Sequence, residues 1–503
     1  MAERLTALDA SFLYLETPQM HMHVAGLTIL DPSTRPDGRL PLDDVRRLLA
    51  SRLHLAPRLR QRVVMVPGNL GLPLWVDDAS FDLDFHLRRA ALPSPGGRPE
   101  LTEYVQRSIS RPLDRTKPLW ELHVIEGLED GHVATLFKAH HAMIDGISGM
   151  QLSAAVYDLQ PVPPEPSRRP RWVPEPTPSP PDLIRGAIQE QLTHPFRAVT
   201  EAADRVARSP AVAALGLSVV ATGVRSLVDM GSRPPSSLDV PIGPNRRFAM
   251  TEASLERYKA IKDALGGTVN DVVLAVVAGA LHRLLRARGE ATRGRSVRAL
   301  VPVSVRHAGD VGFGNRVAPA FLNLPVGRMS PGTRLARIRE GTHRLKSSTM
   351  AMSADAIIGL GAYAPGGMLA AAARLASYAP VFNLVVSNVP GPQQPMYMAG
   401  AKLLANYPAM PIGRSSALSV ACTSLGGTMA FGLTGDRDGM PDLDDLAGAL
   451  AEALGEMAKA AAVQGSASAP AAVGGSRRAS PRRPGPSGPG PRSSGRDRPR
   501  AGA

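Results

Sequence analysis

The stretch His140-His141-Ala142-Met143-Ile144-Asp145-Gly146 decides how the rest of the chain is interpreted. Residues 132–139 before it (HVATLFKA) are mostly apolar, with β-branched and aromatic side chains, which predicts a β-strand. Residues from 147 onward (ISGMQLSAAVYDL) carry apolar side chains at helical spacing. The seven residues are therefore predicted to lie where a strand opens toward a helix, a position at which a scaffold can hold side chains rigidly in a cleft.

Two adjacent histidines followed by a carboxylate and a glycine suit acid–base chemistry, because an imidazole exchanges a proton near neutral pH. Two other interpretations stay open from these residues alone. His140 and His141 could be a purely structural pair, or they could bind a metal ion together with Asp145. The metal interpretation is disfavoured, because adjacent histidines point apart on an extended chain and no further His, Cys or Glu cluster lies nearby in the sequence.

The composition is that of a globular protein with room for two domains. The chain has 503 residues, of which 44% are hydrophobic and 20% are charged. A single cysteine, Cys422, excludes an intramolecular disulfide.

The net charge of +14 invites a nucleic-acid interpretation, but its distribution does not favour one. Residues 464–503 hold eight arginines and one aspartate, so half of the net charge lies in that tail. Aromatic residues make up only 4% of the chain, too few for base-stacking platforms. The basic charge fits better with a small phosphate-bearing ligand or with an anionic membrane surface.

Four regions are predicted along the chain. Residues 1–160 form a first lobe, in which a strand starting at Trp120 turns at Asp130-Gly131 and returns to deliver His140. Residues 161–239 form a linker, which is Pro-rich over 161–182 and helical afterwards. Residues 240–462 form a second lobe, and residues 463–503 a disordered basic tail.

The second lobe is predicted to alternate between helices and strands. Its helices span residues 255–265, 268–288 and 442–462, with Gly266-Gly267 closing the first. Its strands span residues 297–306, 382–388, 417–424 and 428–434, and the last two are expected to pair as a hairpin across Gly426-Gly427.

The HHxxxDG pattern resembles the catalytic motif of the CoA-dependent acyltransferase superfamily. Further motifs, in order, make the chain similar to the bacterial wax ester synthase/diacylglycerol acyltransferase family over almost all of residues 1–462. They are residues 8–16 (LDASFLYLE) with 22–24 (MHV), 118–120 (PLW), 270–271 (ND), 387–392 (SNVPGP), and 431–434 (FGLT) with 436–438 (DRD). One departure is the turn at 422–427 (CTSLGG), which replaces the family's usual Ser-Tyr-Asn/Asp-Gly type.

The resemblance implies an α/β (α+β) fold of two chloramphenicol-acetyltransferase-like lobes with a substrate tunnel between them. It implies an acyl-CoA-dependent O-acyltransferase that makes triacylglycerol from diacylglycerol, wax ester from a long-chain alcohol, or both. Acyl-CoA is then a substrate, and neither a cofactor nor a metal is expected. The expected location is cytoplasmic, peripheral on the inner face of the membrane or on lipid bodies.

The resemblance also assigns roles to residues. His141 is expected to be the general base, and His140, Asp145 and Gly146 complete the motif. Asp145 is expected to pair with an arginine, for which Arg60 is the first candidate and Arg306 the second. Stabilisation of the oxyanion is expected from backbone amides or from Asn270, and both stay open. Asp271, which can also cap a helix with Thr268, and Trp120 are expected to be structural residues near the site.

Two competing functions remain. A condensation-type acyltransferase would take its acyl group from a carrier protein instead of from CoA. A catalytically inactive relative would bind lipid without turnover, for instance on a lipid body. The PLW, ND and SNVPGP motifs disfavour the first alternative, and the intact His140-His141-Asp145-Gly146 set disfavours the second.

Overall fold

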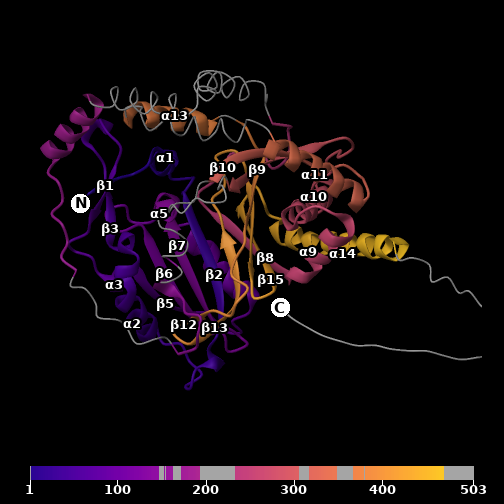
Figure 1. Ribbon diagram of the computed structural model, residues 1–503, viewed down its shortest axis with the longest axis horizontal. Helices are drawn as coiled ribbons and strands as arrows, with labels where there is room; N and C mark the ends of the chain where they lie inside the picture. Colours follow the sequence, from indigo (N-terminus) through magenta and orange to yellow (C-terminus); the bar gives the residue numbers. More distant parts are fainter. Residues whose placement is uncertain are drawn as a thin grey trace, which may run out of the picture.

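Two six-stranded sheets form the centre of the molecule, one in each half (Figure 1). The computed structural model describes residues 2–146, 152, 155–162, 172–192, 233–304, 317–347, 366–378 and 380–468. Residues 147–151, 153 and 154 of the segment that was predicted as a helix, most of the predicted linker, Arg306 and nearly all of the basic tail lie outside the described residues.

The first sheet carries the histidine motif. Its strand β7 pairs antiparallel with β6, Trp120 lying opposite Ala139, which confirms the predicted hairpin. On its other side β7 pairs with β2, His23 lying opposite His140. The strand order is β12 (Tyr397–Met398), β13 (Ala401–Ala409), β2 (His23–Asp31), β7 (Val133–His140), β6 (Trp120–Glu126) and β5 (Leu87–Ala91).

The second sheet is covered by four helices that gather on one side of it (Figure 1). These are α9 (Leu255–Leu265), α10 (Val269–Ala287), α11 (Pro331–Ser347) and α14 (Leu443–Ser468). The strand order is β10 (Val317–Pro325), β9 (Ser296–Ser304), β11 (Leu384–Val389), β14 (Leu418–Leu425), β15 (Thr428–Asp436) and β8 (Arg246–Ser254). Helix α10 is buried along most of its length, as expected for an apolar helix at the centre of a lobe.

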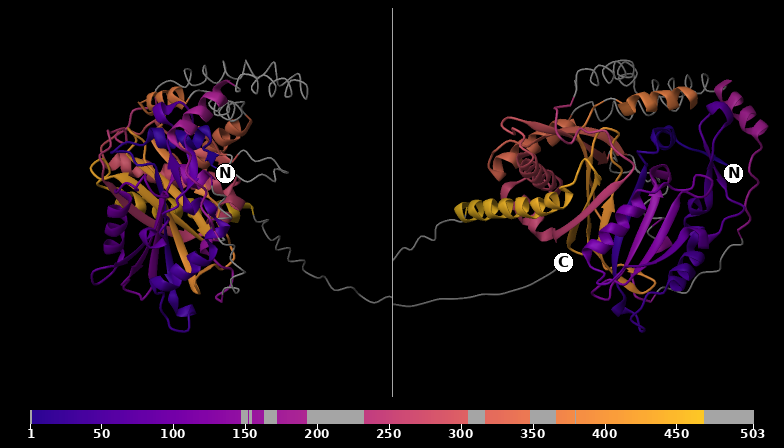
Figure 2. Two further views of the ribbon diagram at one scale, coloured as in Figure 1. Left: turned by 90° about the vertical axis from the view of Figure 1, so that its left-hand side faces the viewer. Right: turned by 180° about the vertical axis from the view of Figure 1, so that it is seen from behind.

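Strands β12 and β13 leave the second lobe and join the first sheet. Tyr407 of β13 lies opposite Leu27 of β2, although the two residues are far apart in the sequence. The predicted range 240–462 therefore includes two strands of the first sheet. This exchange ties the lobes together, and two views of the junction are given in Figure 2.

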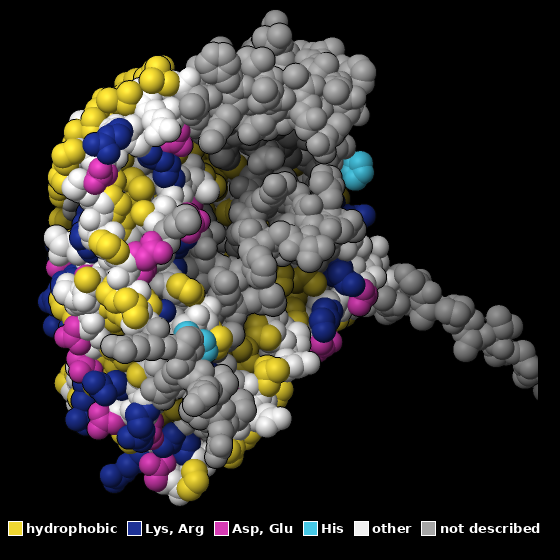
Figure 3. Space-filling model, turned by 60° about the vertical axis from the view of Figure 1, so that its left-hand side comes forward, with side chains coloured by type: hydrophobic (Ala, Val, Ile, Leu, Met, Phe, Trp, Pro, Cys, Tyr) yellow, Lys and Arg dark blue, Asp and Glu magenta, His cyan; other side chains and the backbone are white. Residues whose placement is uncertain are grey.

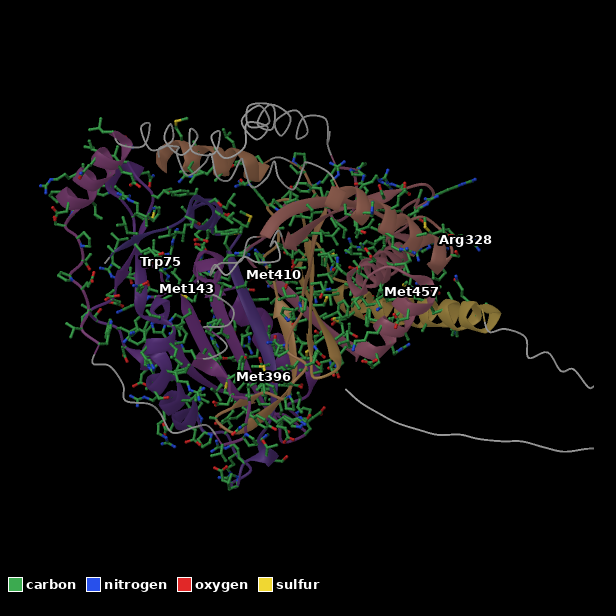
Figure 4. All side chains as sticks on the ribbon, viewed as in Figure 1. Trp75, Met143, Arg328, Met396, Met410 and Met457 are labelled. Atoms are coloured by element: carbon green, nitrogen blue, oxygen red, sulfur yellow. The ribbon has the colours of Figure 1, made fainter. Side chains whose placement is uncertain are left out.

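The lobes are held together by polar and apolar contacts around β8. Helix α4 (Arg98–Ile109) of the first lobe donates hydrogen bonds to β8, from Arg98 to the Met250 carbonyl at 2.8 Å and from Gln106 to the Phe248 carbonyl at 3.3 Å. The Tyr407 hydroxyl donates to Glu252 at 2.6 Å. Figure 4 shows Met410, just after β13, between Met143 in the first lobe and Met457 in the second.

A smaller three-stranded sheet, β1 (Glu3–Arg4), β4 (Leu74–Asp77) and β3 (Gln61–Val64), lies at the edge of the first lobe. Helix 180–192 packs Leu183 and Ala187 against it. Helix α13 (Gly366–Tyr378) packs on α1 (Ala7–Leu15). Among the described helices, none alone has the length and apolarity needed to cross a membrane. Helices α9 and α10 reach that length and apolarity only when taken together, and they are bent by 99° at the break between them.

Gly432 is required by the close approach of β15 to β13. A Cβ atom at this position would lie 1.9 Å from the carbonyl oxygen of Pro408, a backbone atom that cannot turn aside. We expect Gly432→Ala to lower the free energy of unfolding by about 1–3 kcal/mol. The matched control is Gly448→Ala in α14, where a Cβ meets no atom within 4 Å. Its expected effect is neutral or a stabilisation of about 0.5–1 kcal/mol. Equal urea denaturation curves for the two variants would contradict the tight packing of the lobes.

Candidate active site

The predicted junction of strand and helix is present. His140 is the last residue of β7, and His141 is the first residue of α5 (His141–Gly146). The backbone N–H of His141 donates to the Met22 carbonyl at 2.8 Å, and His23 lies opposite His140 in the sheet. The start of β2 therefore fixes the backbone of both histidines.

His140 is fully buried, and the surrounding atoms define its tautomer. The backbone N–H of Ala142 donates to Nδ1 of His140 at 3.1 Å, so Nδ1 carries no proton and the neutral ring carries its proton on Nε2. That nitrogen lies 3.6 Å from Oε2 of Glu16. Burial lowers the pKa of His140, although the Glu16 carboxylate opposes this, so the ring is neutral at physiological pH.

Glu16 lies at the centre of a cluster of basic groups. Its Oε1 is 3.3 Å from Nε2 of His23, and its Oε2 is 3.8 Å from the guanidinium of Arg115. Burial acts to raise the pKa of this carboxyl, but the His140 and His23 imidazoles outweigh burial and hold the pKa well below its ordinary value. The carboxylate is therefore ionised within the protein interior.

His141 differs from His140 in both burial and surroundings. Its side chain is half-buried, and its ring stacks on the ring of Phe12 with centroids 4.0 Å apart and planes inclined by 27°. The aromatic ring supports one face of the imidazole, and the partial exposure of His141 contrasts with the full burial of His140. This geometry suits the general-base role that the sequence predicts for His141.

The structure leaves the predicted partner of Asp145 untested. Asp145 and Gly146 end α5, but the side chain of Asp145 is not among those described, and Arg306 lies outside the described residues. The guanidinium of Arg60, the first candidate partner, lies over the indole of Trp172 at 4.5 Å from the ring centroid. The pairing of Asp145 with Arg60 stays a prediction.

Trp120 and Asp271 both have structural contacts. The indole N–H of Trp120 donates to the Leu59 carbonyl at 2.8 Å, and the ring stacks on His86 with centroids 4.5 Å apart. Asp271 completes a capping box with Thr268 at the start of α10 and accepts a hydrogen bond from Thr342 at 2.7 Å.

Asn270 joins two of the motifs. Its Oδ1 accepts a hydrogen bond of 3.2 Å from Nδ2 of Asn388, which belongs to the SNVPGP motif at the end of β11. Because its oxygen is already engaged, the Asn270 amide has its N–H groups left for donation. Within the described part of the chain, no group of three or more His, Cys, Asp and Glu residues is arranged to hold a metal ion.

Sequence reasoning gave no chemical role to Phe12 or Glu16. Both lie in the LDASFLYLE segment, which was identified only as a family motif. Phe12 lies in α1 (Ala7–Leu15), whereas Glu16 follows the helix in an extended conformation, so helical spacing in the sequence could not have linked the two to a common neighbour.

Solved structures of known proteins share this fold. A wax ester synthase/diacylglycerol acyltransferase from Marinobacter aquaeolei VT8 is 30% identical, with a TM-score of 0.62, covering 91% of this chain and all of that one. The starter condensation domain of rhizomide synthetase, solved with C8-CoA and Leu-SNAC, is 14% identical, with a TM-score of 0.55 and coverage of 92% and 94%. The two-lobed fold and the HHxxxDG loop define an acyltransferase of the CoA-dependent superfamily.

Comparison with models of protein families shows which family of this superfamily the chain matches. The wax ester synthase/diacylglycerol acyltransferase catalytic domain matches residues 5–273, and the WS/DGAT C-terminal domain matches residues 313–458. A Mycobacterium tuberculosis protein, provisionally named a diacylglycerol O-acyltransferase, is 33% identical over 468 residues, covering 90% of each chain. The chain belongs to the wax ester synthase/diacylglycerol acyltransferase family, which confirms the predicted family and the predicted two-lobed fold.

The cluster around Glu16 makes the fold sensitive to acid. Burial lowers the pKa of His23 to about 4, so between pH 6.5 and 4 the unfolded chain binds a proton that the folded chain does not. Stability is therefore complete above pH 6.5 and falls by on the order of 3 kcal/mol down to pH 4 from His23 alone. The depressed pKa of Glu16 continues this loss at lower pH.

Urea unfolding at pH 7.5, 6 and 5 tests this expectation. His23→Gln keeps a hydrogen-bond donor for Glu16 but does not titrate. This variant should show a weaker dependence of the free energy of unfolding on pH than the wild type. His132→Gln, at the far turn of the hairpin between β6 and β7, should leave the dependence unchanged. If the free energy of unfolding fell equally with pH in the wild type and in His23→Gln, His23 would not be the cause of the acid sensitivity.

Proposed function

We propose that the protein is an acyl-CoA-dependent O-acyltransferase that makes triacylglycerol from diacylglycerol, wax ester from a long-chain alcohol, or both. The observation that carries the proposal is the difference between the two histidines. His140 is fully buried with one nitrogen accepting a backbone hydrogen bond, whereas His141 is half-buried on Phe12. The names of the family and of the mycobacterial relative support the reaction class.

His141 acts as the general base in this mechanism. It takes the hydroxyl proton of the acceptor while the hydroxyl oxygen attacks the carbonyl carbon of the thioester. The tetrahedral intermediate then collapses, the C–S bond breaks, and the imidazolium of His141 gives its proton to the CoA thiolate. Because a thiol has a pKa near ~8.5, the thiolate leaves readily and no covalent enzyme intermediate is needed.

The remaining motif residues support this reaction without taking the proton. The amide of Asn270, oriented by Asn388, is the candidate donor to the oxyanion. Asp145 holds the loop through an arginine, and Gly146 allows the chain to turn. A tunnel between the lobes holds acyl-CoA and the acceptor together, which reduces the entropic part of the barrier.

Release of free CoA tests the proposal. Purified protein receives palmitoyl-CoA with a diacylglycerol in one tube and with hexadecanol in another. We expect release that depends on the acceptor and falls by about 10²- to 10⁴-fold in His141→Ala, since that substitution removes the base. His132→Ala serves as the control and should keep wild-type turnover.

Other results of this assay favour the competing functions. Normal turnover by folded His141→Ala would contradict the general-base role. No release by folded wild-type protein would favour a carrier-protein donor, the chemistry of a condensation-type enzyme, or lipid binding without turnover. The ratio of CoA release with diacylglycerol to CoA release with hexadecanol identifies the preferred acceptor.

A lipid acceptor requires contact with a lipid surface, and two helices offer apolar side chains for it. Ile188 and Leu192 of helix 180–192 are 48% and 68% exposed, and Met368 and Leu375 of α13 are 65% and 73% exposed. Both helices approach the loop at residues 69–71, where Gln191 donates to the Leu70 carbonyl and Gly366 lies close to the backbone of Gly71. On the face shown in Figure 3, acidic and basic side chains intermingle, so the coloured part of this face shows no continuous basic patch of the kind that binds nucleic acid.

Sedimentation with phosphatidylglycerol-containing vesicles tests the lipid surface. The double variant Met368→Ser/Leu375→Ser should bind at least about tenfold more weakly than the wild type, because two apolar anchors are lost. Val463→Ser replaces a side chain of α14 that is 70% exposed in the other lobe and should bind normally. Equal binding by the wild type and the double variant would exclude α13 as the contact.

A further inference from the structure

Helix α1 and Glu16, the extended residue that follows it, contact both histidines of the motif. Phe12 stacks on the ring of His141, and Glu16, four residues later, lies 3.6 Å from Nε2 of His140. The helix is anchored at its start by Thr6, whose hydroxyl accepts a hydrogen bond from the backbone N–H of Asp9 at 3.0 Å. The end of α1 and the residue after it therefore contact two adjacent side chains of the motif, one residue to each.

The charge of Glu16 is compensated within the protein. Its carboxylate is only 10% exposed and is shared between His23 at 3.3 Å, His140 at 3.6 Å and Arg115 at 3.8 Å. Neutral imidazoles offer N–H donors but no positive charge, and the arginine is the most distant of the three. Since an ionised carboxylate is costly to bury, this arrangement indicates a requirement for negative charge at this position.

Further titratable groups surround the cluster. The ring of His21 stacks on His23 with centroids 5.4 Å apart, and both line a cavity of about 20 Å³ with Arg246 and Thr434 of the second lobe. Arg246 lies 3.8 Å from Asp436. Lys138 of β7 also acts on His23 and has its own partner, Glu121, at 3.3 Å.

We propose that Glu16 is a positioning residue for acyl transfer: its carboxylate fixes the ring of His140, and its negative charge stabilises the imidazolium that forms on His141. This inference rests on the proposed function. Glu16 touches neither substrate nor the reacting atoms, and it keeps its own charge throughout. Nδ1 of His140 accepts the hydrogen bond from Ala142 at the start of α5, and its Nε2 faces the Glu16 carboxylate at 3.6 Å, an electrostatic contact longer than a hydrogen bond.

Two substitutions separate the orientation of His140 from the charge of Glu16. Glu16→Ala removes both and should lower kcat by about 10- to 100-fold, the range for losing a group that orients a functional histidine. Glu16→Gln keeps the shape and an acceptor oxygen but removes the charge. Its acidic limb of kcat/KM against pH should move to lower pH, because the negative charge that favours the protonated base is lost.

Glu121→Gln is the matched control. Glu121 is also a partly buried carboxylate of the first lobe, with its Oε2 3.2 Å from Nε2 of His123 and 3.3 Å from Nζ of Lys138. Its loss should lower stability and leave the acidic limb at the wild-type pH. An unmoved acidic limb in folded Glu16→Gln would overturn the electrostatic role, because packing alone does not require the charge.

A measurement without substrate separates this inference from the proposed function. In ¹⁵N-histidine spectra of the full chain, assigned with His23→Gln and His140→Gln, the Nε2–H protons of His23 and His140 should resonate downfield in the wild type and in Glu121→Gln. They should move upfield in Glu16→Ala, since the carboxylate acceptor is lost. Identical spectra for the wild type and Glu16→Ala would overturn the contact. Absence of CoA release by the wild type, with these shifts present, would instead refute the acyltransferase assignment.

Discussion

The pairing of β2 with β7 is the constraint on which the site depends. It places His23 opposite His140 and brings the carbonyl of Met22 to the backbone N–H of His141. The turn from strand into α5 therefore begins from a fixed backbone, and the two histidines leave it in different directions. One is buried against Ala142 and Glu16, and the other lies half-buried on Phe12.

The same sheet explains why the two lobes act as one unit. Strand β13 comes from the second half of the sequence but pairs with β2, the strand that supports the histidines. On its other side, Gly432 of β15 packs against the backbone of Pro408 so closely that no side chain fits. Interlobe packing thus reaches the strand that carries the histidine motif through one intervening strand, β2.

Much of the fold could be predicted because it depends on local patterns. The turn at Asp130-Gly131 predicts the hairpin that carries the motif, and Gly266-Gly267 separates α9 from α10, as the sequence indicates. The pairing of β12 and β13 with strands of the first sheet could not be predicted. The side chains of an apolar strand do not indicate which sheet the strand will join, since both sheets bury side chains of the same kind.

The sequence by itself determined the family, the two lobes and the identity of the histidine motif, because ordered motifs and hydrophobic periodicity are properties of the chain alone. Only the tertiary structure decided how the two histidines differ. His140 and His141 are the same type of residue in the same local sequence. The difference in their chemistry therefore depends on the side chains that other segments place beside them. Here that is Phe12 for His141 and the Glu16 carboxylate for His140, two contacts made by α1 and the residue after it, more than a hundred residues away in the chain.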